Sequence, residues 1–477
     1  TLRAYGTERD ISVTADQFAD ATYEGDLLAL AEVPYRVGRE ARDEYGEPHA
    51  GKVFVNIDHS PPVGVVAEGL NIRAYTSRQG TVDPTSPFSA DGNSQAYNYR
   101  FCVSKDPNNR VMVTEPPAGY RREEYVDYER KGIATNAGPN LKSHMNSPIL
   151  PGENQAYPEA SWAEREKIIE RHKNFALGLI WFLQNDESVP EGKRQEFRQW
   201  GLAKDEFADH GHIPYEMYVR EARRLVGRHV ITEHDGMLAK DCRRSPLHAD
   251  SVAVTDWYMD SHSCTMDSRP GFKYDGKLIL TEESRPMQIP YRAMLPQGVD
   301  NLLVPVCLSS THIAWGALRL EPVWMQTGEA AGVAAAMAKA AGVAPAELDS
   351  EALVRELARR GHLISFFNEP KIDPAKPEVV AAQYFGTKGF FSSYDAKLDD
   401  PLAESTARVW AGALNRVDAE DYDPAETARQ IAAANQAGGP PANGADFATR
   451  IGVVSGNPTL TRGQALALMW EAIQAKK

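Results

Sequence analysis

Polar side chains that could take part in acid–base chemistry gather in CLSSTHIAWGALR, residues 307–319. Ser310, Thr311, His312 and Arg319 lie there, between an apolar run and a predicted helix. His312 could exchange a proton with a ligand, or it could cap the helix. Arg319 just before a helix is electrostatically unfavourable, because the positive end of the helix dipole repels a cation. A ligand phosphate or carboxylate close by would remove that conflict.

A second group of polar residues lies in YMDSHSC, residues 258–264. If this segment is an extended strand, Asp260 and His262 point to the same side, because side chains alternate along a strand. The pair could act as a general base and its orienting partner, or form a structural hydrogen bond. No third ligand follows at a suitable spacing, and the same holds for HGH at residues 210–212. We therefore expect no metal site.

The segment LEPVWMQTGEAAGVAAAMAKA, residues 320–340, predicts a long helix that begins near Pro322 and ends before Gly342. Small residues, Gly328 among them, occupy much of its surface. A backbone is therefore expected to pack very close to it. The partner is either a neighbouring helix or sheet, or a dinucleotide whose phosphate lies near the helix amino terminus. The preceding strand and polar loop favour the ligand, because open α/β sheets bind ligands where strands end.

The other elements follow from periodicity, turns and caps. Ser161 and Glu164 form a capping box that begins a helix with apolar residues on one face. Another helix is predicted over residues 215–226, with its arginines on a solvated or ion-paired face. We further predict a hairpin at residues 2–13, strands at 15–21, 50–60, 70–76 and 96–104, a short helix at 26–33, and three or four short helices without an internal repeat after residue 345.

Composition argues against several classes of protein. The 477 residues carry a formal net charge of −14, which disfavours a nucleic-acid partner, because such binding needs a basic face. No apolar run approaches the roughly 20 residues of a membrane-spanning helix. The four cysteines form no CxxC pair, which argues against zinc ribbons and dithiol redox motifs. A periplasmic or secreted location is favoured over a cytoplasmic one, without being fixed.

Several stretches, taken in order, resemble the FAD-dependent oxidoreductases that bacteria often encode beside polysaccharide-degrading genes, some of which carry the name xanthan lyase. The similar stretches are FADATYEGDLLALAEVPYRVGREARDEYGE (18–47), QAYNYRFCV (95–103), the segments LIWFLQND, WGLAKDEF and YVREARRLVG within 179–227, and PYRAMLPQGVDNLLVPVCLSSTHIAWGALRLEPVWMQTGEAAGVAAAMA (290–338). The resemblance covers about residues 1–345, and its last stretch is the most specific.

The resemblance implies FAD, bound between an amino-terminal βαβ unit and the strand and helix of residues 286–345. Carried over to this sequence, the residues near FAD would be Thr22, Gly25, Asp300, Asn301, Leu303, Ser310, Thr311, Glu321 and Gly328. The candidates for catalysis and anion contact are His312, Asp260, His262 and Arg319. The GxGxxG pattern that binds the ADP pyrophosphate is not found in the sequence. Either a further amino-terminal segment or a partner chain supplies it, or the protein has lost FAD; the small residues of the flavin-facing helix favour the first two.

Together these observations predict an α/β protein with three parts. A partial FAD/NAD(P)-binding, Rossmann-like domain comprises residues 1–34 and 286–345, a mixed α+β cap comprises 35–285, and a C-terminal helical region comprises 346–477. The expected activity is hydride transfer from a small molecule or carbohydrate to flavin. Two alternatives are a non-catalytic binding or structural protein of an extracellular assembly and a polysaccharide lyase.

Overall fold

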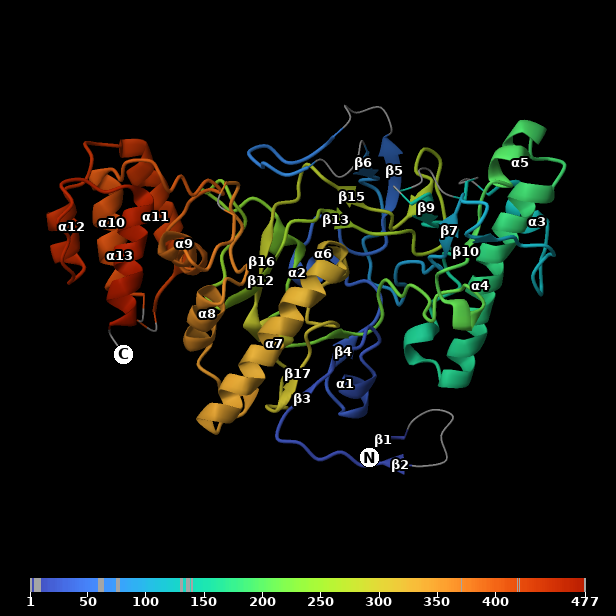
Figure 1. Cartoon of the computed structure of the whole chain (residues 1–477), viewed down its shortest axis with the longest axis horizontal. Helices are drawn as coiled ribbons and strands as arrows, with labels where there is room; N and C mark the ends of the chain where they lie inside the picture. Colours follow the sequence, from blue (N-terminus) through green and yellow to red (C-terminus); the bar gives the residue numbers. More distant parts are fainter. Residues whose placement is uncertain are drawn as a thin grey trace. The chain divides into compact units, whose positions relative to one another are not determined.

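The computed structural model describes residues 2–3, 10–58, 64–73, 78–128, 132–133, 138, 140–369, 371–417, 419 and 421–475 (Figure 1). The chain forms two compact units. The first unit comprises residues 1–11, 92–222 and 262–267, and the second comprises residues 12–91, 223–261 and 268–477. The predicted cap segment 35–285 thus contributes to both units: its middle forms most of the first, and residues 35–91 and 223–261 belong to the second.

The first unit packs a small sheet and a long helix around an aromatic core. Its elements are β1 (Leu2–Arg3), β2 (Asp10–Ile11), β7 (Cys102–Ser104), β8 (Arg110–Val111), α3 (Glu123–Val126), β9 (Lys142–His144), η1 (Tyr157–Glu159), α4 (Trp162–Asn185), α5 (Glu191–Phe197), β10 (Gly201–Ala203) and η2 (Ala208–His210). The predicted hairpin is confirmed by the antiparallel pairing of β1 with β2. The capping box of Ser161 and Glu164 begins α4, as expected. Phe175, Leu179 and Leu183 on α4 are buried in the core with the tyrosines of residues 97–99.

The second unit contains several short sheets and most of the helices. Its elements before residue 349 are β3 (Phe18–Ala19), α1 (Asp26–Leu30), β4 (Tyr35–Arg36), α2 (Arg42–Tyr45), β5 (Phe54–Asp58), β6 (Gln79–Val82), β11 (Arg224–Leu225), η3 (Glu233–Gly236), β12 (Ser251–Thr255), β13 (Met259–Asp260), β14 (Tyr274–Asp275), β15 (Ile279–Leu280), β16 (Met287–Pro290), η4 (Tyr291–Met294), β17 (Leu302–Leu303), α6 (His312–Leu318), α7 (Glu321–Ala341) and η5 (Pro345–Glu347). β12 pairs with β16, β13 with β15, β4 with β11, and β5 lies between β14 and β6. β17 pairs with β3 in parallel.

Helix α7 has the bounds that the sequence predicts, and Gly342 ends it in the left-handed conformation. The helix packs on β12 through buried residues, among them Ala330, Ala331 and Ala334. Gln326 joins the two elements: its amide donates to the carbonyl oxygen of Val254 at 3.0 Å and accepts from the Val254 N–H at 3.1 Å. The small residues on this face therefore allow the helix to approach the edge of a strand.

The glycines of α6 and α7 have opposite surroundings, which gives a matched pair of substitutions. A Cβ on Gly316 would lie 2.8 Å from the backbone nitrogen of Asp260 and 2.9 Å from its oxygen, whereas within the described residues nothing lies within 4 Å of a Cβ on Gly328. We expect Gly316→Ala to lower the free energy of unfolding by about 1–3 kcal/mol through overpacking. Gly328→Ala should raise it by roughly 0.5–1 kcal/mol, because Ala restricts the unfolded chain. Urea unfolding of both variants measures the difference, and equal effects would contradict this packing.

The predicted helix at residues 215–226 is wrong: this stretch is irregular and ends in β11. Burial of its arginines explains the error. In the first unit, Arg220 donates to a backbone carbonyl oxygen at 2.5 Å, and in the second, Arg224 donates to the carbonyl oxygen of Ser310 at 2.8 Å and to Glu40 at 2.9 Å. Buried guanidinium groups need fixed acceptors of this kind, which an exposed helix face does not offer.

Six helices follow residue 348 in the part of the chain that the structure describes, more than the three or four predicted. They are α8 (Ser350–Arg359), α9 (Pro377–Thr387), α10 (Glu404–Leu414), α11 (Pro424–Ala437), α12 (Gly444–Arg450) and α13 (Arg462–Gln474). Three short segments, residues 401–403, 441–443 and 459–461, are joined to one another by isolated β-bridges: Pro401 pairs with Thr461, Ala403 with Pro441, and Asn443 with Thr459. Helices α10, α12 and α13 each begin directly after one of these segments. A turn–helix unit therefore occurs three times, although no repeat is evident in the sequence.

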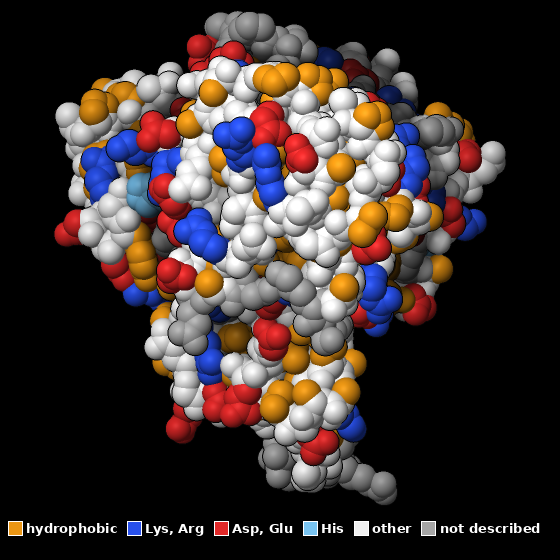
Figure 2. Space-filling view, turned by 90° about the vertical axis from the view of Figure 1, so that its left-hand side faces the viewer, with side chains coloured by type: hydrophobic (Ala, Val, Ile, Leu, Met, Phe, Trp, Pro, Cys, Tyr) orange, Lys and Arg blue, Asp and Glu red, His pale blue; other side chains and the backbone are white. Residues whose placement is uncertain are grey.

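The face that carries these C-terminal helices is mixed in charge. Figure 2 shows Lys and Arg side chains lying beside Asp and Glu side chains on it. A surface of this kind lacks the single-sign field that nucleic-acid binding requires. Among the described residues, no helix combines the length and apolar character needed to cross a membrane.

Candidate active site at the carboxyl end of β17

The candidate site lies in the second unit, where β17 runs into the segment 304–311, whose last three residues are polar. The parallel pairing of β17 with β3 places the loops that follow both strands at the same sheet edge. The stretch 225–231 runs beside this segment: the Ile231 N–H donates to the carbonyl oxygen of Ser309 at 3.1 Å, and the Thr311 N–H donates to that of Ile231 at 2.8 Å. Thr311 then caps α6. This strand–loop–helix order is the one predicted, and such an edge is where open α/β sheets bind ligands.

A buried carboxyl group, Glu47, faces this segment. Its Oε1 accepts hydrogen bonds from the Thr311 hydroxyl at 2.6 Å and from the Glu233 N–H at 2.6 Å. Its Oε2 is buried and makes no hydrogen bond to any described residue. Burial raises the pKa of Glu47 to about 7, although these two hydrogen bonds oppose the shift. A carboxyl group with such a pKa can accept a proton near neutral pH.

A second carboxylate, Glu40, holds the start of α6. Its Oε2 accepts from the backbone N–H of His312 at 2.9 Å, and its Oε1 accepts from Arg224 at 2.9 Å. Arg224 also donates to the carbonyl oxygen of Ser310 at 2.8 Å. All of these groups are buried. The ion pair therefore fixes the backbone of residues 310–312 from one side, while Glu47 holds the Thr311 side chain.

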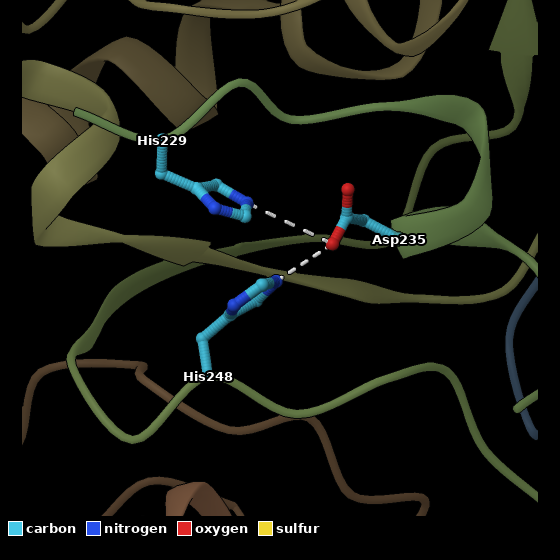
Figure 3. Close-up of side chains that lie close together, drawn as sticks. All are labelled: His229, Asp235 and His248. Atoms are coloured by element: carbon cyan, nitrogen blue, oxygen red, sulfur yellow. Dashed lines mark hydrogen bonds and ion pairs between the residues drawn. The ribbon is translucent and has the colours of Figure 1, made fainter. Parts of the chain in front are cut away.

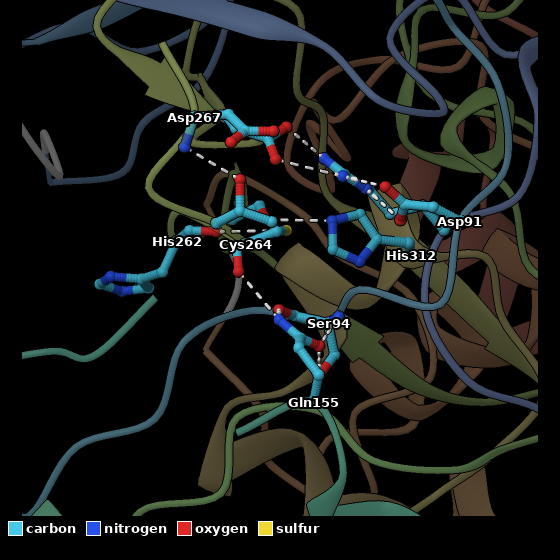
Figure 4. Close-up of polar contacts among 11 residues, drawn as sticks. Asp91, Ser94, Gln155, His262, Cys264, Asp267 and His312 are labelled. Carbon is cyan, nitrogen blue, oxygen red and sulfur yellow. Dashed lines mark hydrogen bonds and ion pairs between the residues drawn. The ribbon is translucent and has the colours of Figure 1, made fainter. Parts of the chain in front are cut away.

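His312 is buried, and its Nε2 lies 3.1 Å from the hydroxyl oxygen of Ser261 (Figure 4). The ring is thereby oriented, as a capping or an acid–base histidine would be. The neighbouring hydroxyl of Ser310 is also buried, but it has no hydrogen-bond partner among the described residues. Two buried polar atoms without a hydrogen bond to a described residue are thus associated with one loop: Ser310 Oγ lies in it, and Glu47 Oε2 is on the carboxyl group that accepts from Thr311. Buried polar groups in this state normally have a ligand or water as partner.

Arg319 does not need a ligand anion, because Asp260 supplies the charge. The Arg319 guanidinium donates to the Asp260 carboxylate at 2.9 Å and to its backbone oxygen at 3.2 Å. The Arg319 side chain is 2% exposed and that of Asp260 is 19% exposed. The sequence-based explanation of Arg319 by a phosphate or a substrate carboxylate is therefore replaced by an internal ion pair.

The predicted pairing of Asp260 with His262 joins residues of different units and stays a prediction. Strand β13 ends at Asp260, whose carboxylate is bound to Arg319. His262 belongs to the first unit, where its backbone N–H donates to Gln95 at 3.2 Å. That part of the first unit is held by hydrogen bonds such as the one from the Gln155 amide to the carbonyl oxygen of Cys264, at 2.8 Å (Figure 4). A catalytic role of His262 or Asp260 stays a prediction.

Thr22 and Gly25, expected near FAD, build the turn after β3. The Thr22 hydroxyl donates to Asp20 at 2.7 Å and accepts from the Gly25 N–H at 3.0 Å. Gly25 has a φ of +67°, and a Cβ there would lie 2.9 Å from Leu28 and 3.1 Å from the sulfur of Cys307. Glycine is thus required by the backbone and by packing at this position.

The remaining residues expected near FAD are spread along β17 and α7. Asp300 and Asn301 precede β17, at the end of the strand opposite Ser310 and Thr311, and Asp300 forms an exposed ion pair with Arg228 at 2.6 Å. Three further positions complete the set: Leu303 is buried within β17, and Glu321 and Gly328 are exposed on α7. Ser310, Thr311 and His312 follow one another after β17. The contacts of all these residues with FAD stay predictions.

Sequence reasoning missed Glu40, Glu47 and Arg224. The available signal was the segment GREARDEYGE, residues 38–47, in which charged residues lie between glycines. The segment belongs to a stretch that carries the family resemblance, but its carboxylates look like ordinary surface residues. Their importance comes from burial, since charged side chains are rarely buried without a partner.

Comparison with known proteins identifies a family. A family model described as FAD dependent oxidoreductase matches residues 2–357, more than half of the chain. No curated protein and no solved structure matches the chain significantly. The flavin-binding fold and activity expected from the sequence are thereby supported at the level of the family. The chain belongs to the FAD dependent oxidoreductase family, and its cofactor is FAD.

Proposed function

We propose that this flavoenzyme oxidises an alcohol or amine carbon of a small, sugar-like molecule. The observation that supports this most directly is the buried carboxyl of Glu47, held by Thr311 at the carboxyl end of β17, with its second oxygen lacking a hydrogen-bond partner among the described residues. The orphaned hydroxyl of Ser310 belongs to the same loop. These two atoms could each form a hydrogen bond with a polar ligand at this edge, and a flavin with its substrate is such a ligand.

The roles of the residues follow from their contacts. FAD, when bound, would supply the hydride acceptor, so a protein group is needed to take the proton from the substrate hydroxyl or amine. Glu47 is our candidate for that base, because Oε2 is available and its pKa is raised to about 7 by burial. His312, oriented by Ser261, is the second candidate. Glu40 positions the loop through the His312 N–H.

The pyrophosphate of FAD requires contacts of a different kind. No two glycines in the sequence are separated by a single residue, so the GxGxxG pattern is absent. Helix α7 presents an open face in which Met325 is 73% exposed and no described atom lies within 4 Å of a Cβ on Gly328 or Gly332. We therefore propose that polypeptide other than these 477 residues, either a further segment or a partner chain, packs there and binds the pyrophosphate.

An absorbance spectrum of natively purified protein, with its intact mass, tests this proposal. We expect the two visible bands of oxidised flavin, with the mass revealing additional polypeptide. Sugars, polyols and amines are then added anaerobically, and only the class that contains the substrate should bleach the flavin. The proposal would be wrong if the protein had the mass of these 477 residues alone and stayed colourless after incubation with FAD. Release of unsaturated sugars from a polysaccharide by such a colourless protein would indicate a lyase instead.

A further inference from the structure

Three side chains able to ligate a metal come together in the second unit, and none of them is among the contacts described for Glu47. They are His229, Asp235 and His248, and their ligating atoms all lie within 4.8 Å of one another (Figure 3). Nε2 of His248 lies 2.8 Å from Oδ1 of Asp235, and Nε2 of His229 lies 3.9 Å from the same oxygen. The two imidazole rings face each other edge-on, with centroids 4.9 Å apart.

We propose that His229, Asp235 and His248 bind one divalent transition-metal ion of the zinc type. Two imidazoles and a carboxylate are ligands that Zn²⁺ accepts, and three protein ligands leave a fourth position for water. A tetrahedral ion with bonds of about 2.0–2.1 Å holds its ligand atoms roughly 3.3 Å apart. The two nitrogen–oxygen distances, 2.8 and 3.9 Å, lie on either side of that value. Small side-chain movements would therefore complete the site.

The surrounding groups prepare the cluster for a cation. Oδ2 of Asp235 accepts from the backbone N–H of Thr232 at 2.7 Å and from its hydroxyl at 3.0 Å, which directs Oδ1 toward the histidines. Supporting hydrogen bonds of this kind commonly orient metal ligands. Nε2 of His229 is buried and makes no hydrogen bond to any residue that the structure describes. The cluster thus has a held carboxylate and a histidine nitrogen without a hydrogen-bonded partner.

The charge near the cluster is compatible with a bound cation. The two histidines would bind the ion through neutral imidazole nitrogens, and Asp235 supplies the negative charge. Arg292 is a cation that acts on His229, and its charge is balanced by Asp250, to which it donates at 2.9 and 3.1 Å. The side chain of His229 is 26% exposed, whereas those of Asp235 and His248 are 11% and 9% exposed. The cluster is therefore least buried at His229.

A metal here would join three separate parts of the chain. His229 lies in the stretch beside Ser309, Asp235 lies in η3, and His248 precedes β12. Residue Glu233, also in η3, donates its N–H to Glu47 at 2.6 Å. The ion would thus fix the element that supports the Glu47 carboxyl, without itself contacting that residue. This inference does not depend on the proposed substrate.

Calorimetric titration of chelator-treated protein with Zn²⁺ tests the site without any need for activity. We expect one ion per wild-type chain and a rise in the unfolding temperature. His229→Ala should weaken binding by at least roughly 10–100-fold, since even supporting residues of metal sites have effects of that size. It should lower metal-free stability only through lost ring packing, because Nε2 of His229 makes no hydrogen bond within the described chain. Asp235→Asn should likewise abolish the thermal shift.

The matched control replaces two histidines of the first unit that lie outside the cluster. Nδ1 of His210 donates to the carbonyl oxygen of Ile213 at 2.9 Å, and Nδ1 of His212 donates to that of Glu206 at 3.3 Å. The variant His210→Ala/His212→Ala should bind Zn²⁺ as the wild type does. No uptake by the wild type would overturn the proposal. Unchanged binding by His229→Ala would also overturn it. An equal loss of binding in the control would overturn it too, because the binding would then belong to scattered surface histidines.

Discussion

Replacing Glu47 by Gln should lower kcat by about 10²–10⁴-fold, the usual loss when a general base is removed. Gln keeps the shape of the side chain and an oxygen that can accept from Thr311 and the Glu233 N–H, as Oε1 of Glu47 does. It cannot take a proton from substrate. Flavin bleaching under anaerobic conditions, with whichever alcohol or amine the wild type oxidises, measures the rate of this half-reaction. The flavin spectrum of the variant should be unchanged.

The same substitution, which lowers kcat, should raise the free energy of unfolding at neutral and alkaline pH. The folded-state pKa of Glu47 is raised from 4.5 to about 7, so folding favours the protonated form. The stability that this group contributes is therefore complete below about pH 4.5 and is lost as the pH rises toward 7. Glu47→Gln removes that loss. Above pH 7 the variant should be more stable than the wild type by up to about 3 kcal/mol, and urea unfolding at several pH values measures this.

Glu44→Gln is the matched control for both measurements. Glu44 lies on α2, three residues before Glu47, and forms an ion pair with Arg36. Each of these two side chains is 34% exposed. Such pairs contribute at most about 1 kcal/mol. The control should retain turnover and the pH dependence of stability. A Glu47→Gln enzyme with wild-type kcat would exclude Glu47 as the base and leave His312 as the candidate.

Replacing Arg319 by Met should destabilise the fold by about 3–5 kcal/mol, the cost of leaving one partner of a buried ion pair without its counterion. Arg319 is nearly fully buried and donates to both the carboxylate and the backbone oxygen of Asp260. The partial exposure of Asp260, 19%, places the expected value at the lower end of that range. Denaturant unfolding of the holoenzyme and of protein without added FAD measures it.

Two comparisons separate the ion pair from lost packing. The double variant Arg319→Met/Asp260→Asn removes both charges and should recover much of the stability, because no uncompensated charge stays buried. Arg359→Met breaks an exposed pair with Glu356, in which the Arg359 side chain is 63% exposed, and should cost less than about 1 kcal/mol. If the double variant were as unstable as Arg319→Met, packing rather than charge would explain the loss. A large loss of kcat in a stable Asp260→Asn variant would support the catalytic role predicted from sequence.

Local signals in the sequence were sufficient for the elements that short-range rules determine. The capping box at Ser161 and Glu164 gave the start of α4, and Pro322 and Gly342 gave the bounds of α7. Each of these features depends on neighbouring residues along the chain. The motif stretches also identified the family, and with it FAD, because they are long enough to be specific. The loop holding Ser310, Thr311 and His312 was found for the same reason.

Burial of charge could not be read from these patterns. The arginines of residues 215–226 suit an exposed helix by spacing, yet the chain there is irregular because Arg220 and Arg224 are buried against backbone acceptors. Arg319 suggested a bound anion, and the anion proved to be Asp260, 59 residues away in sequence. Distant partners of this kind decide the conformation, and no local spacing encodes them.

The sequence by itself therefore determined the helices with clear caps, the strand–loop–helix at the carboxyl end of β17, the family and the cofactor. Only the tertiary structure placed Glu47 beside Thr311 and brought His229, Asp235 and His248 together. The physical reason is that pKa and metal affinity depend on burial and on distances between side chains. Those quantities arise when separate segments pack, and residues 229, 235 and 248 follow no ligand spacing that a sequence motif would reveal.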